Sequence, residues 1–217
     1  MLKIYGADLS APSNKVRMAA NKLGLEYEYI LVALRDKEHK ELWFLDLNPV
    51  GKIPVIDDDG FILFESDAII KYLAQKEKSD IYPSELKKRA LIEQWMDFTS
   101  IHIGGAMSRV LFNRVFAKFA KVEADERSLQ DGLNFLHRFL PVVDKQLKEH
   151  PYLAGNSFSL ADISLLATLD PVDIGGISIE EQDNIVKWRQ ALKSQDFYLK
   201  CHKEYGEKLK GIFKDRT

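Results

Sequence analysis

The sequence is poor in cysteine, because its 217 residues include only Cys201. One cysteine allows no intrachain disulfide and provides no thiol pair for dithiol–disulfide exchange. This scarcity is typical of a reducing compartment, and we expect a cytoplasmic protein. Since Cys201 lies late in the chain, far along the sequence from the motifs described below, we predict that it takes no part in catalysis.

An excess of one charge is also missing. Lysine and arginine total 31 and aspartate and glutamate 33, which leaves a formal net charge of -2 at pH 7. Such a balance creates no field that attracts a polyanion, and no basic cluster typical of a nucleic-acid reader is present. We therefore expect no nucleic-acid partner.

Long hydrophobic runs and metal-ligand spacings are absent from the sequence as well. No apolar run reaches the length of a membrane span, and charges interrupt the N-terminal segment where a signal peptide has its apolar core. The five histidines do not have the spacing of metal ligands. We expect no membrane attachment and no metal site.

The chain is nevertheless rich enough in apolar residues, at 46%, to fold into two modest domains. Residues 1–78 alternate between strand and helix patterns. Strands are predicted at 2–5, 26–31, 53–56 and 61–64, and helices at 14–23, 38–47 and from Ser66, which is expected to cap its helix. A helical crossover favours a parallel strand pair, and the Asp57–Gly60 turn favours an antiparallel hairpin. This order predicts a thioredoxin-like α/β domain with a mixed four-stranded sheet.

The second part of the chain is predicted to be helical throughout. A polar linker over 76–85 precedes an all-α domain over 85–217. Leucine and valine residues spaced by four and three form one apolar stripe from Leu129 to Leu147, and Pro141 is expected to kink that helix. Ser159 and Asp162 have the spacing of a capping box at the start of the next helix.

The turn after the first strand holds the sequence Ser10-Ala11-Pro12-Ser13, where thioredoxins have Cys-x-x-Cys. Without thiols this turn cannot exchange disulfides, but a serine hydroxyl can donate a hydrogen bond to the thiolate of a ligand. The alternative is that a serine here only caps the following helix. Ser10 stands where the nucleophile would, and Ser13 is predicted to cap a helix that starts at Asn14.

Two further stretches suit an extended, charged ligand. Pro54 stands at the start of a strand, where a cis bond would turn Ile53 toward an extended peptide, although an ordinary edge-strand proline is the alternative. Glu65 and Ser66 stand at a predicted helix N-terminus, whose free N–H groups favour a carboxylate while Glu65 pairs with an ammonium. The alternative there is a capped surface helix.

At this spacing and in this order, these stretches resemble the cytosolic glutathione transferases, most closely the serine-type theta and phi classes and their bacterial relatives. The resemblance covers essentially the whole chain. It is carried by Asp8–Ser13, Lys37–Lys40, Asn48–Pro54, Phe64–Ser66 and the helix-capping segment Tyr152–Asp162. One departure is clear: the arginine that some theta members use on the first long helix of the second domain falls near Gly104.

The resemblance implies a role for each matching residue. Ser10 would be the catalytic residue that hydrogen-bonds the glutathione sulfur. The other glutathione-binding residues would be His39 and Lys52 at the glycyl carboxylate, Ile53 with cis Pro54 at the cysteinyl unit, and Glu65 and Ser66 at the γ-glutamyl end. The resemblance also implies a homodimer. For the small hydrophobic electrophile we predict a wall on the first long helix that includes Met107 and Leu111.

The implied activity is a glutathione transferase that activates the thiol of its co-substrate glutathione without a metal. A free thiol has a pKa of about 8.5, and lowering it by about two units requires about 2.7 kcal/mol. A hydrogen bond to a charged group contributes about 1.5–3 kcal/mol and a helix N-terminus about 0.3–1 kcal/mol. One serine and one helix therefore suffice. The alternatives are a non-catalytic binding or dimerisation protein and a glutathione-dependent peroxidase, isomerase or dehalogenase.

Overall fold

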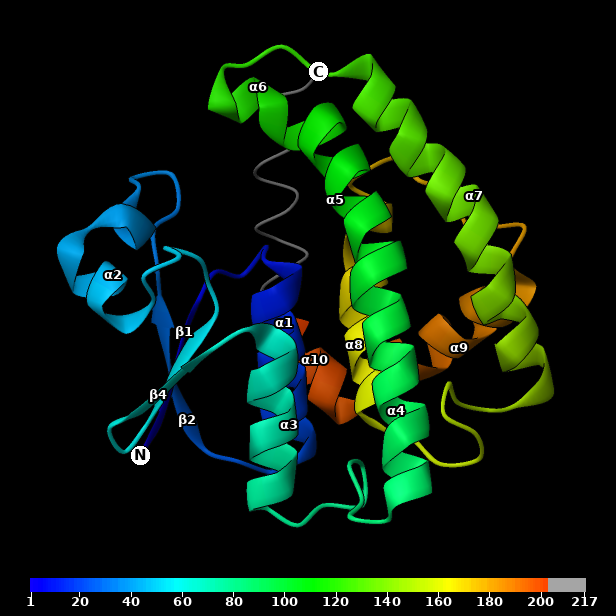
Figure 1. Ribbon diagram of the computed structural model, residues 1–217, viewed down its shortest axis with the longest axis horizontal. Helices are drawn as coiled ribbons and strands as arrows, with labels where there is room; N and C mark the ends of the chain where they lie inside the picture. Colours follow the sequence, from blue (N-terminus) through cyan, green and yellow to red (C-terminus); the bar gives the residue numbers. More distant parts are fainter. Residues whose placement is uncertain (203–217) are drawn as a thin grey trace. The chain divides into compact units, whose positions relative to one another are not determined.

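The computed structural model describes residues 1–202, which form two compact units (Figure 1). Of these residues, unit 1 contains Met1–Glu77 together with residues 193–202, and unit 2 contains Lys78–Leu192. The sequence-based division left everything after residue 85 in the helical domain. The structure differs because α10 (Asp196–His202) packs against α1 (Ala11–Lys22) and so belongs with the first unit.

Unit 1 is built on a mixed four-stranded sheet. Its strands are β1 (Leu2–Gly6), β2 (Tyr27–Leu31), β3 (Val55–Asp58) and β4 (Phe61–Phe64), in the order β2-β1-β3-β4. β1 and β2 are parallel, while β3 is antiparallel to both β1 and β4. The predicted thioredoxin-like sheet is confirmed. β3 begins after Pro54, since proline has no N–H to donate to a neighbouring strand.

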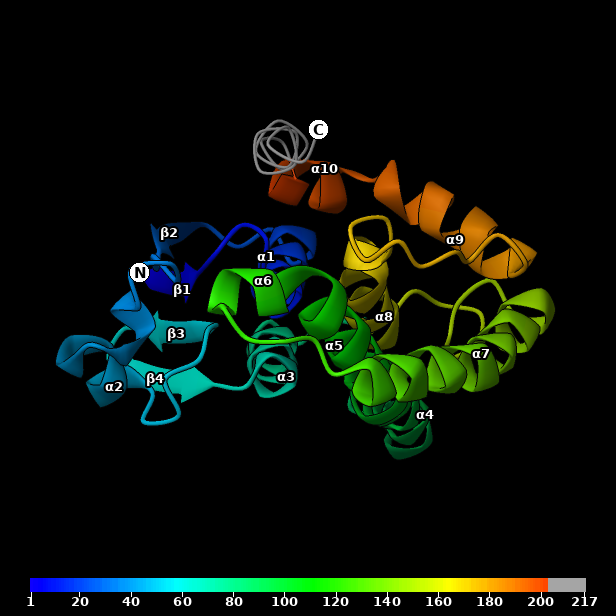
Figure 2. The same ribbon diagram turned by 90° about the horizontal axis from the view of Figure 1, so that it is seen from above.

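Helices cover both faces of this sheet (Figure 2). α1 and α3 (Ser66–Lys76) lie on one face, and the short α2 (Leu42–Leu47) lies on the other after the 3-10 turn η1 (Glu38–Lys40). Successive side chains of a strand point to opposite faces of the sheet, so each face forms a hydrophobic core with the helices that cover it. Val32, Phe44 and Val55 form the core on the α2 side.

Two helix starts differ from the sequence predictions. α1 starts at Ala11 and not at Asn14, and its N-cap is Ser10. α3 starts at Ser66, so the capping position belongs to Glu65, and Ser66 is the first helical residue instead of the cap. Both starts matter for the site described below.

Unit 2 is helical, as the sequence predicts. Two π-helical segments interrupt its first long helix, and the helix Glu126–Glu149 continues past Pro141. Its elements are α4 (Leu86–Phe98), η2 (Thr99–Gly104), α5 (Gly105–Leu111), η3 (Phe112–Phe116), α6 (Ala117–Ala120), α7 (Glu126–Glu149), α8 (Leu160–Leu169), η4 (Asp170–Val172) and α9 (Asp183–Lys193). α8 is the most buried α-helix of unit 2, since every residue in it except Thr168 is buried.

The predicted capping box at the start of α8 is confirmed, and its acid has further partners. Asp162 is completely buried. One carboxylate oxygen accepts from the Ser159 N–H at 2.9 Å and the Ser159 hydroxyl at 3.1 Å, and the other from the Leu153 N–H at 3.0 Å and the Trp188 indole at 3.2 Å. Asp162 thus joins a loop, a helix start and α9.

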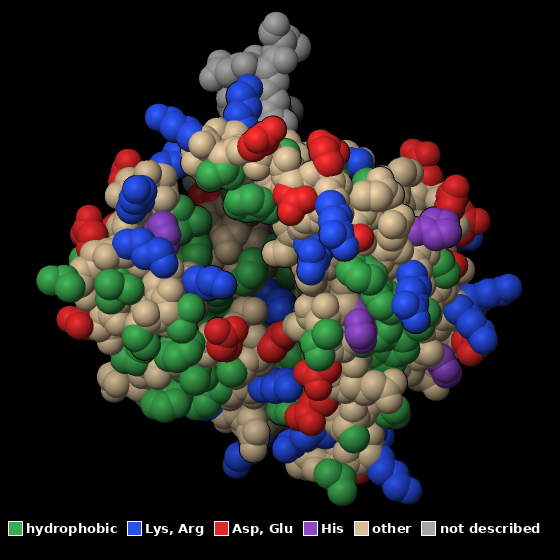
Figure 3. All heavy atoms as spheres, turned by 45° about the horizontal axis from the view of Figure 1, so that its top comes forward, with side chains coloured by type: hydrophobic (Ala, Val, Ile, Leu, Met, Phe, Trp, Pro, Cys, Tyr) green, Lys and Arg blue, Asp and Glu red, His purple; other side chains and the backbone are tan. Residues whose placement is uncertain are grey.

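The surface shows the mixed charge that the composition predicts. Acidic and basic side chains are interspersed over the face in Figure 3. Within residues 1–202, no helix combines the length and the apolar character needed to cross a membrane.

Candidate functional site

The strand register brings the predicted site residues of unit 1 to one edge of the sheet. Tyr5 pairs with Val55, and Val55 pairs with Phe64. The end of β1, the start of β3 and the end of β4 therefore lie side by side, and the parallel β2 ends at the same edge. The segments that follow or precede these ends carry Ser10, His39, Lys52–Pro54 and Glu65–Ser66, so residues far apart in the sequence share one edge.

Ser10 closes a tight turn between β1 and α1. Its N–H donates to the Ala7 carbonyl at 3.0 Å, and its side chain caps α1 by accepting the Ser13 N–H at 3.3 Å. The prediction that Ser13 would be the cap is therefore wrong. A hydroxyl accepts with its lone pairs and donates with its hydrogen, so Ser10 can cap the helix and still donate to a ligand.

Ser13 instead lies inside the unit, where it is completely buried. Its hydroxyl accepts from the Ala7 N–H at 3.4 Å. Gly6 allows this approach, since a Cβ there would lie 2.8 Å from the Ser13 side chain. Ser13 thus stabilises the turn from inside unit 1, and its buried side chain is not available to a ligand.

The loop before β3 contains a cis Ile53–Pro54 peptide bond, as predicted. Pro54 is buried, Ile53 is half-buried and the Lys52 side chain is exposed. The buried Asn48 shapes the loop: its amide donates to the Lys52 carbonyl at 2.7 Å and accepts from the Val50 N–H at 3.0 Å. Asn48 belongs to the stretch that carries the family resemblance, but no role for its side chain was predicted, although its place before a proline was the available signal.

His39 lies in the η1 turn, which Lys40 ties to the loop before β3. The Lys40 ammonium donates to the carbonyl of Gly51 at 3.0 Å and of Val50 at 3.4 Å. Desolvation by burial, and then the charge of Lys40, lower the pKa of His39 below its usual value. Its Nδ1 is buried and has no hydrogen-bond partner among residues 1–202. A carboxylate bound there would reverse this shift, because an opposite charge favours the imidazolium.

Gly51 makes this arrangement possible. Its φ is +61°, a left-handed conformation that favours glycine, and a Cβ there would lie 2.8 Å from the Lys40 ammonium and 2.9 Å from the His39 carbonyl oxygen. Any larger residue would push the η1 turn and the loop apart.

The third segment has an unusual backbone. Glu65 has a φ of +71°, which is uncommon for a residue with a side chain, and its side chain is exposed. Such conformations cluster at functional sites. Directly after it, α3 presents the free N–H groups of its first turn. Asp67 in that turn pairs with the buried Lys15 of α1 at 2.7 Å, so the two helix starts are linked.

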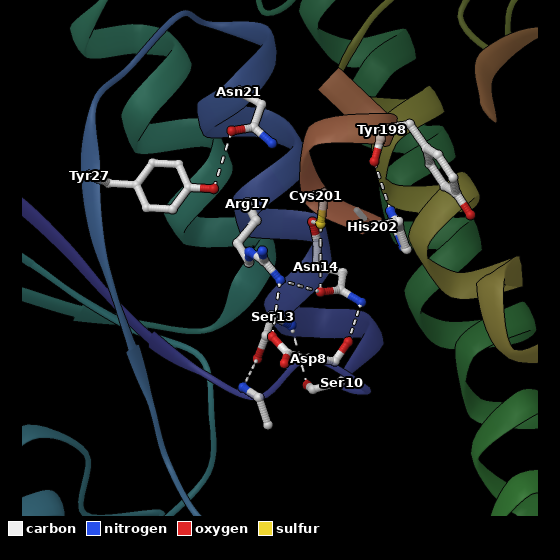
Figure 4. A network of polar contacts seen from close by, with 11 residues as sticks. Asp8, Ser10, Ser13, Asn14, Arg17, Asn21, Tyr27, Tyr198, Cys201 and His202 are labelled. Atoms are coloured by element: carbon white, nitrogen blue, oxygen red, sulfur yellow. Dashed lines mark hydrogen bonds and ion pairs between the residues drawn. The ribbon is translucent and has the colours of Figure 1, made fainter. Parts of the chain in front are cut away.

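Figure 4 shows a polar network next to the Ser10 turn, and no pattern in the sequence predicted it. Asn14 is its centre, Arg17 joins it to Asp8, and Cys201 of α10 lies with its sulfur 3.6 Å from the Asn14 side-chain oxygen. Such residues cannot be recognised from the sequence, because nothing in it indicates that the polar Asn14 is buried.

The residues predicted for the electrophile wall lie on α5 in unit 2. Met107 is 2% exposed and Leu111 is half-buried. Their role stays a prediction. Within residues 1–202, no group of histidine, cysteine, aspartate and glutamate side chains has the arrangement of a metal site.

Comparison with known proteins gives one consistent match. Residues 4–80 match the family "Glutathione S-transferase, N-terminal domain", and residues 105–196 match "Glutathione S-transferase, C-terminal domain". Glutathione S-transferase F14 of Arabidopsis thaliana is 31% identical over 193 residues, which cover 83% of this chain and 74% of that protein.

Solved structures agree with this match. Glutathione transferase F7 from Populus trichocarpa superimposes with a TM-score of 0.86 at 28% identity, over 94% of this chain and 98% of that one. A glutathione S-transferase from Pseudomonas fluorescens gives a TM-score of 0.80 at 31% identity, over 90% and 96% of the two chains.

Proposed function

The chain belongs to the glutathione S-transferase family, and we propose that it binds glutathione at the sheet edge of unit 1 and activates the thiol through Ser10. It is a glutathione transferase, and the reaction is attack of the thiolate on a small hydrophobic electrophile. The observation that supports this assignment is the position of Ser10, at a helix N-terminus on the edge where the other candidate residues gather.

Ser10 supplies the chemistry without a base. Its hydroxyl accepts the Ser13 N–H, and its own hydrogen is directed to the sulfur, where it stabilises the thiolate more than the thiol. The N-terminus of α1 adds a partial positive charge at the same place. The two effects together supply the roughly 2.7 kcal/mol that a thiol pKa two units lower requires.

The remaining contacts hold the two ends of the tripeptide. His39 and Lys52 take the glycyl carboxylate, Ile53 pairs through its main chain with the cysteinyl unit, and Glu65 and Ser66 hold the γ-glutamyl ammonium and carboxylate. The first turn of α3 provides N–H groups for that carboxylate. Met107 and Leu111 contribute to the electrophile wall. The single cysteine supports a cytoplasmic location.

Calorimetric titration with glutathione, followed by turnover of aromatic halides, hydroperoxides and isothiocyanates, tests the assignment. We expect binding and conjugation of at least one carbon electrophile. Binding without turnover of any of them would favour the non-catalytic alternative. Turnover of hydroperoxides alone would favour the peroxidase.

The glycyl end of the site predicts a specific effect at Gly51. We expect Gly51→Ala to weaken glutathione binding severalfold, since the new methyl group displaces the turn that carries His39 and Lys40. Gly60→Ala is the matched control: Gly60 has a φ of +92° but nothing within 4 Å of a Cβ. Each variant carries the left-handed backbone cost of about 1–2 kcal/mol. Equal glutathione affinities in the two variants would contradict the proposed position of His39.

A homodimer is the final part of the proposal. Unit 2 carries an aromatic cluster on α4, η2 and α7, in which the His102 ring lies 5.1 Å from that of Phe98 and 4.6 Å from that of Phe139. Ile101 beside it is 67% exposed and Phe135 is 40% exposed. Exposed apolar patches of this kind mark interfaces, and twofold dimers are the commonest oligomers.

Light scattering at micromolar concentration is expected to give the mass of a dimer, and Ile101→Asp is expected to reduce it to that of a monomer. Leu199→Asp places the same charge on another exposed residue, 51% exposed on α10, and should leave the dimer intact. A monomeric mass for the unmodified protein would refute the proposal.

A further inference from the structure

We propose that Asn14 is a positioning residue for the thiol-activating step, and that it acts by fixing the turn that carries Ser10. This inference rests on the proposed function, because it assigns Asn14 a role through Ser10. It concerns a buried amide of this chain that does not face the glutathione site.

The polar atoms of the Asn14 side chain are all engaged, although the residue is completely buried. Its Nδ2 donates to the Asp8 carbonyl at 2.8 Å. Its Oδ1 accepts from the Arg17 guanidinium at 3.5 Å and lies 3.6 Å from the Cys201 sulfur (Figure 4). A buried amide with this many partners has one orientation, since rotation would leave a donor or an acceptor unpaired.

The carbonyl that Asn14 holds belongs to the turn itself. Asp8 and Leu9 are the middle residues of the Ala7–Ser10 turn, which the Ser10 N–H closes onto the Ala7 carbonyl. Holding the Asp8 carbonyl fixes the plane of the peptide between Asp8 and Leu9. The next peptide along the chain is the one that joins Leu9 to Ser10. In addition, the Asn14 N–H donates to the Ser10 carbonyl at 2.9 Å, so Asn14 contacts the turn at two of its residues, Asp8 and Ser10.

Arg17 reinforces the same turn through the Asp8 side chain. Its guanidinium pairs with the Asp8 carboxylate at 3.4 Å and lies over the Tyr29 ring, 4.2 Å from its centroid. Arg17 is therefore held between α1 and β2. The same guanidinium donates to the Asn14 Oδ1 at 3.5 Å, so replacing Asn14 removes one of the contacts that hold Arg17 beside the turn.

A residue that positions Ser10 should affect the pKa of the glutathione thiol more than the affinity of the protein for glutathione. A hydrogen bond weakens steeply when its distance or angle departs from the optimum, and a displacement of about 0.5 Å already takes a catalytic group out of its productive geometry. Ser10 holds the sulfur through one such bond. Glutathione affinity depends mainly on the two ends of the tripeptide, which are bound by residues outside this turn.

Among residues 1–202, the charged and titratable groups around Asn14 are Asp8 from the turn, Arg17 from α1, Tyr27 and Tyr29 from β2, and Cys201 from α10. Asn14→Ala changes none of these charges. A shift in the pH dependence of this variant therefore reports the geometry at Ser10 and not an added charge.

Asn21 provides a matched control on the same helix. Like Asn14, it carries an amide that contacts α10. Its Nδ2 donates to the Phe197 carbonyl and its Oδ1 accepts from the Tyr27 hydroxyl, both at 3.1 Å. Neither partner belongs to the Ala7–Ser10 turn. Asn21→Ala thus removes a comparable link between α1 and α10 without touching the turn.

The test compares the unmodified protein with Asn14→Ala, Asn21→Ala and Ser10→Ala. It measures the pH dependence of kcat/KM, the ultraviolet absorbance of bound thiolate and glutathione affinity by calorimetry. For Asn14→Ala we expect the thiol pKa to rise by about 0.5–1 unit and neutral-pH turnover to fall about three- to tenfold. Glutathione affinity should stay within about twofold. Asn21→Ala should lower the melting temperature and leave the thiol pKa unchanged.

A second variant covers the case in which Asn14→Ala does not fold. Asn14→Ser is too short to reach the Asp8 carbonyl, while its hydroxyl can bond within the helix, and we expect the same shift. Equal thiol pKa values in the Asn14 variant and the unmodified protein would overturn the inference, as would equal shifts in the Asn14 and Asn21 variants. If Ser10→Ala shifts the pKa while Asn14 variants do not, the positioning role alone fails. If Ser10→Ala has no effect, the proposed function fails with it.

Discussion

Asp162→Ala is expected to lower the free energy of unfolding by about 4 kcal/mol or more, which is a large part of the total stability of a typical domain. The carboxylate accepts four hydrogen bonds from groups in three segments of unit 2, and alanine replaces none of them. Each buried donor left without an acceptor costs about 1–3 kcal/mol. Chemical denaturation followed by circular dichroism measures the loss.

Asp125→Ala is the control for this change. Asp125 caps α7 by accepting the Ser128 N–H at 2.9 Å, but it is exposed, so water can replace it. We expect a loss of about 1 kcal/mol, which is the usual cost of an N-cap. Asp162→Asn should fall between the two, since its carbonyl can still accept while its amide faces other donors. Similar losses for Asp162→Ala and Asp125→Ala would show that the buried network adds little.

The Asp162 effect should depend on pH. Burial raises the pKa of Asp162 to about 6, although its four hydrogen bonds pull the pKa down. A folded-state pKa above the unfolded value of about 3.9 means that ionisation opposes folding. The contribution of Asp162 is therefore greatest below about pH 4 and decreases as the pH rises through 6. The difference in stability between the unmodified protein and Asp162→Ala should narrow over that range. A difference that widens would show that hydrogen bonding outweighs burial.

Much of the fold follows from local patterns in the sequence. The strand order and the hairpin of unit 1 follow from alternation and from the Asp57–Gly60 turn, because these signals act over a few residues. The capping box of α8 could likewise be predicted from the sequence, since its two residues are only three positions apart. The gathering of Ser10, Ile53 and Glu65 at one edge follows once the strand directions are known.

Other features depend on contacts that no local pattern encodes. α10 returns to unit 1 because it packs on α1, and the two helices are more than 170 residues apart in the sequence. For the same reason Cys201 lies against Asn14 at the start of α1 in space, although it is remote from it along the chain. The positive φ of Glu65 could not be predicted from the sequence either, because tertiary context imposes it on a residue type that rarely adopts it.

Ser10 and Ser13 show most clearly what could not be predicted from the sequence. Proline is common in the first turn of a helix, so Pro12 was compatible with a start at either Ala11 or Asn14. The prediction from the sequence was the later start, with Ser13 as the cap. The structure makes Ser10 the cap and buries Ser13, because the tight approach of Gly6 admits a small side chain there. Ser10 must therefore serve the helix and the ligand at once.

Ser10→Ala is accordingly expected to reduce neutral-pH turnover by roughly ten- to a hundredfold, because the thiolate loses a hydrogen bond that contributes about 1.5–3 kcal/mol. The pKa of bound glutathione should rise, and a higher pH should restore part of the rate. Affinity for glutathione should change little, since the other contacts remain. The variant also loses the cap of α1, which should cost about 1 kcal/mol of stability.

Ser13→Ala is the matched control for Ser10→Ala, because it removes the hydroxyl that accepts the Ala7 N–H from the same turn. We expect a comparable loss of about 1 kcal/mol, now from a part-buried N–H left unpaired. The change in the thiol pKa should be much smaller than in Ser10→Ala, because the 3.4 Å contact holds the turn less firmly than the 2.8 Å bond of Asn14. With similar stabilities, the two variants separate the thiolate contact from simple support of the turn. A pH–rate profile for each, beside the unmodified protein, provides the comparison. An unchanged profile in Ser10→Ala, or a shift in Ser13→Ala as large as that expected for Ser10→Ala, would transfer the catalytic assignment away from Ser10.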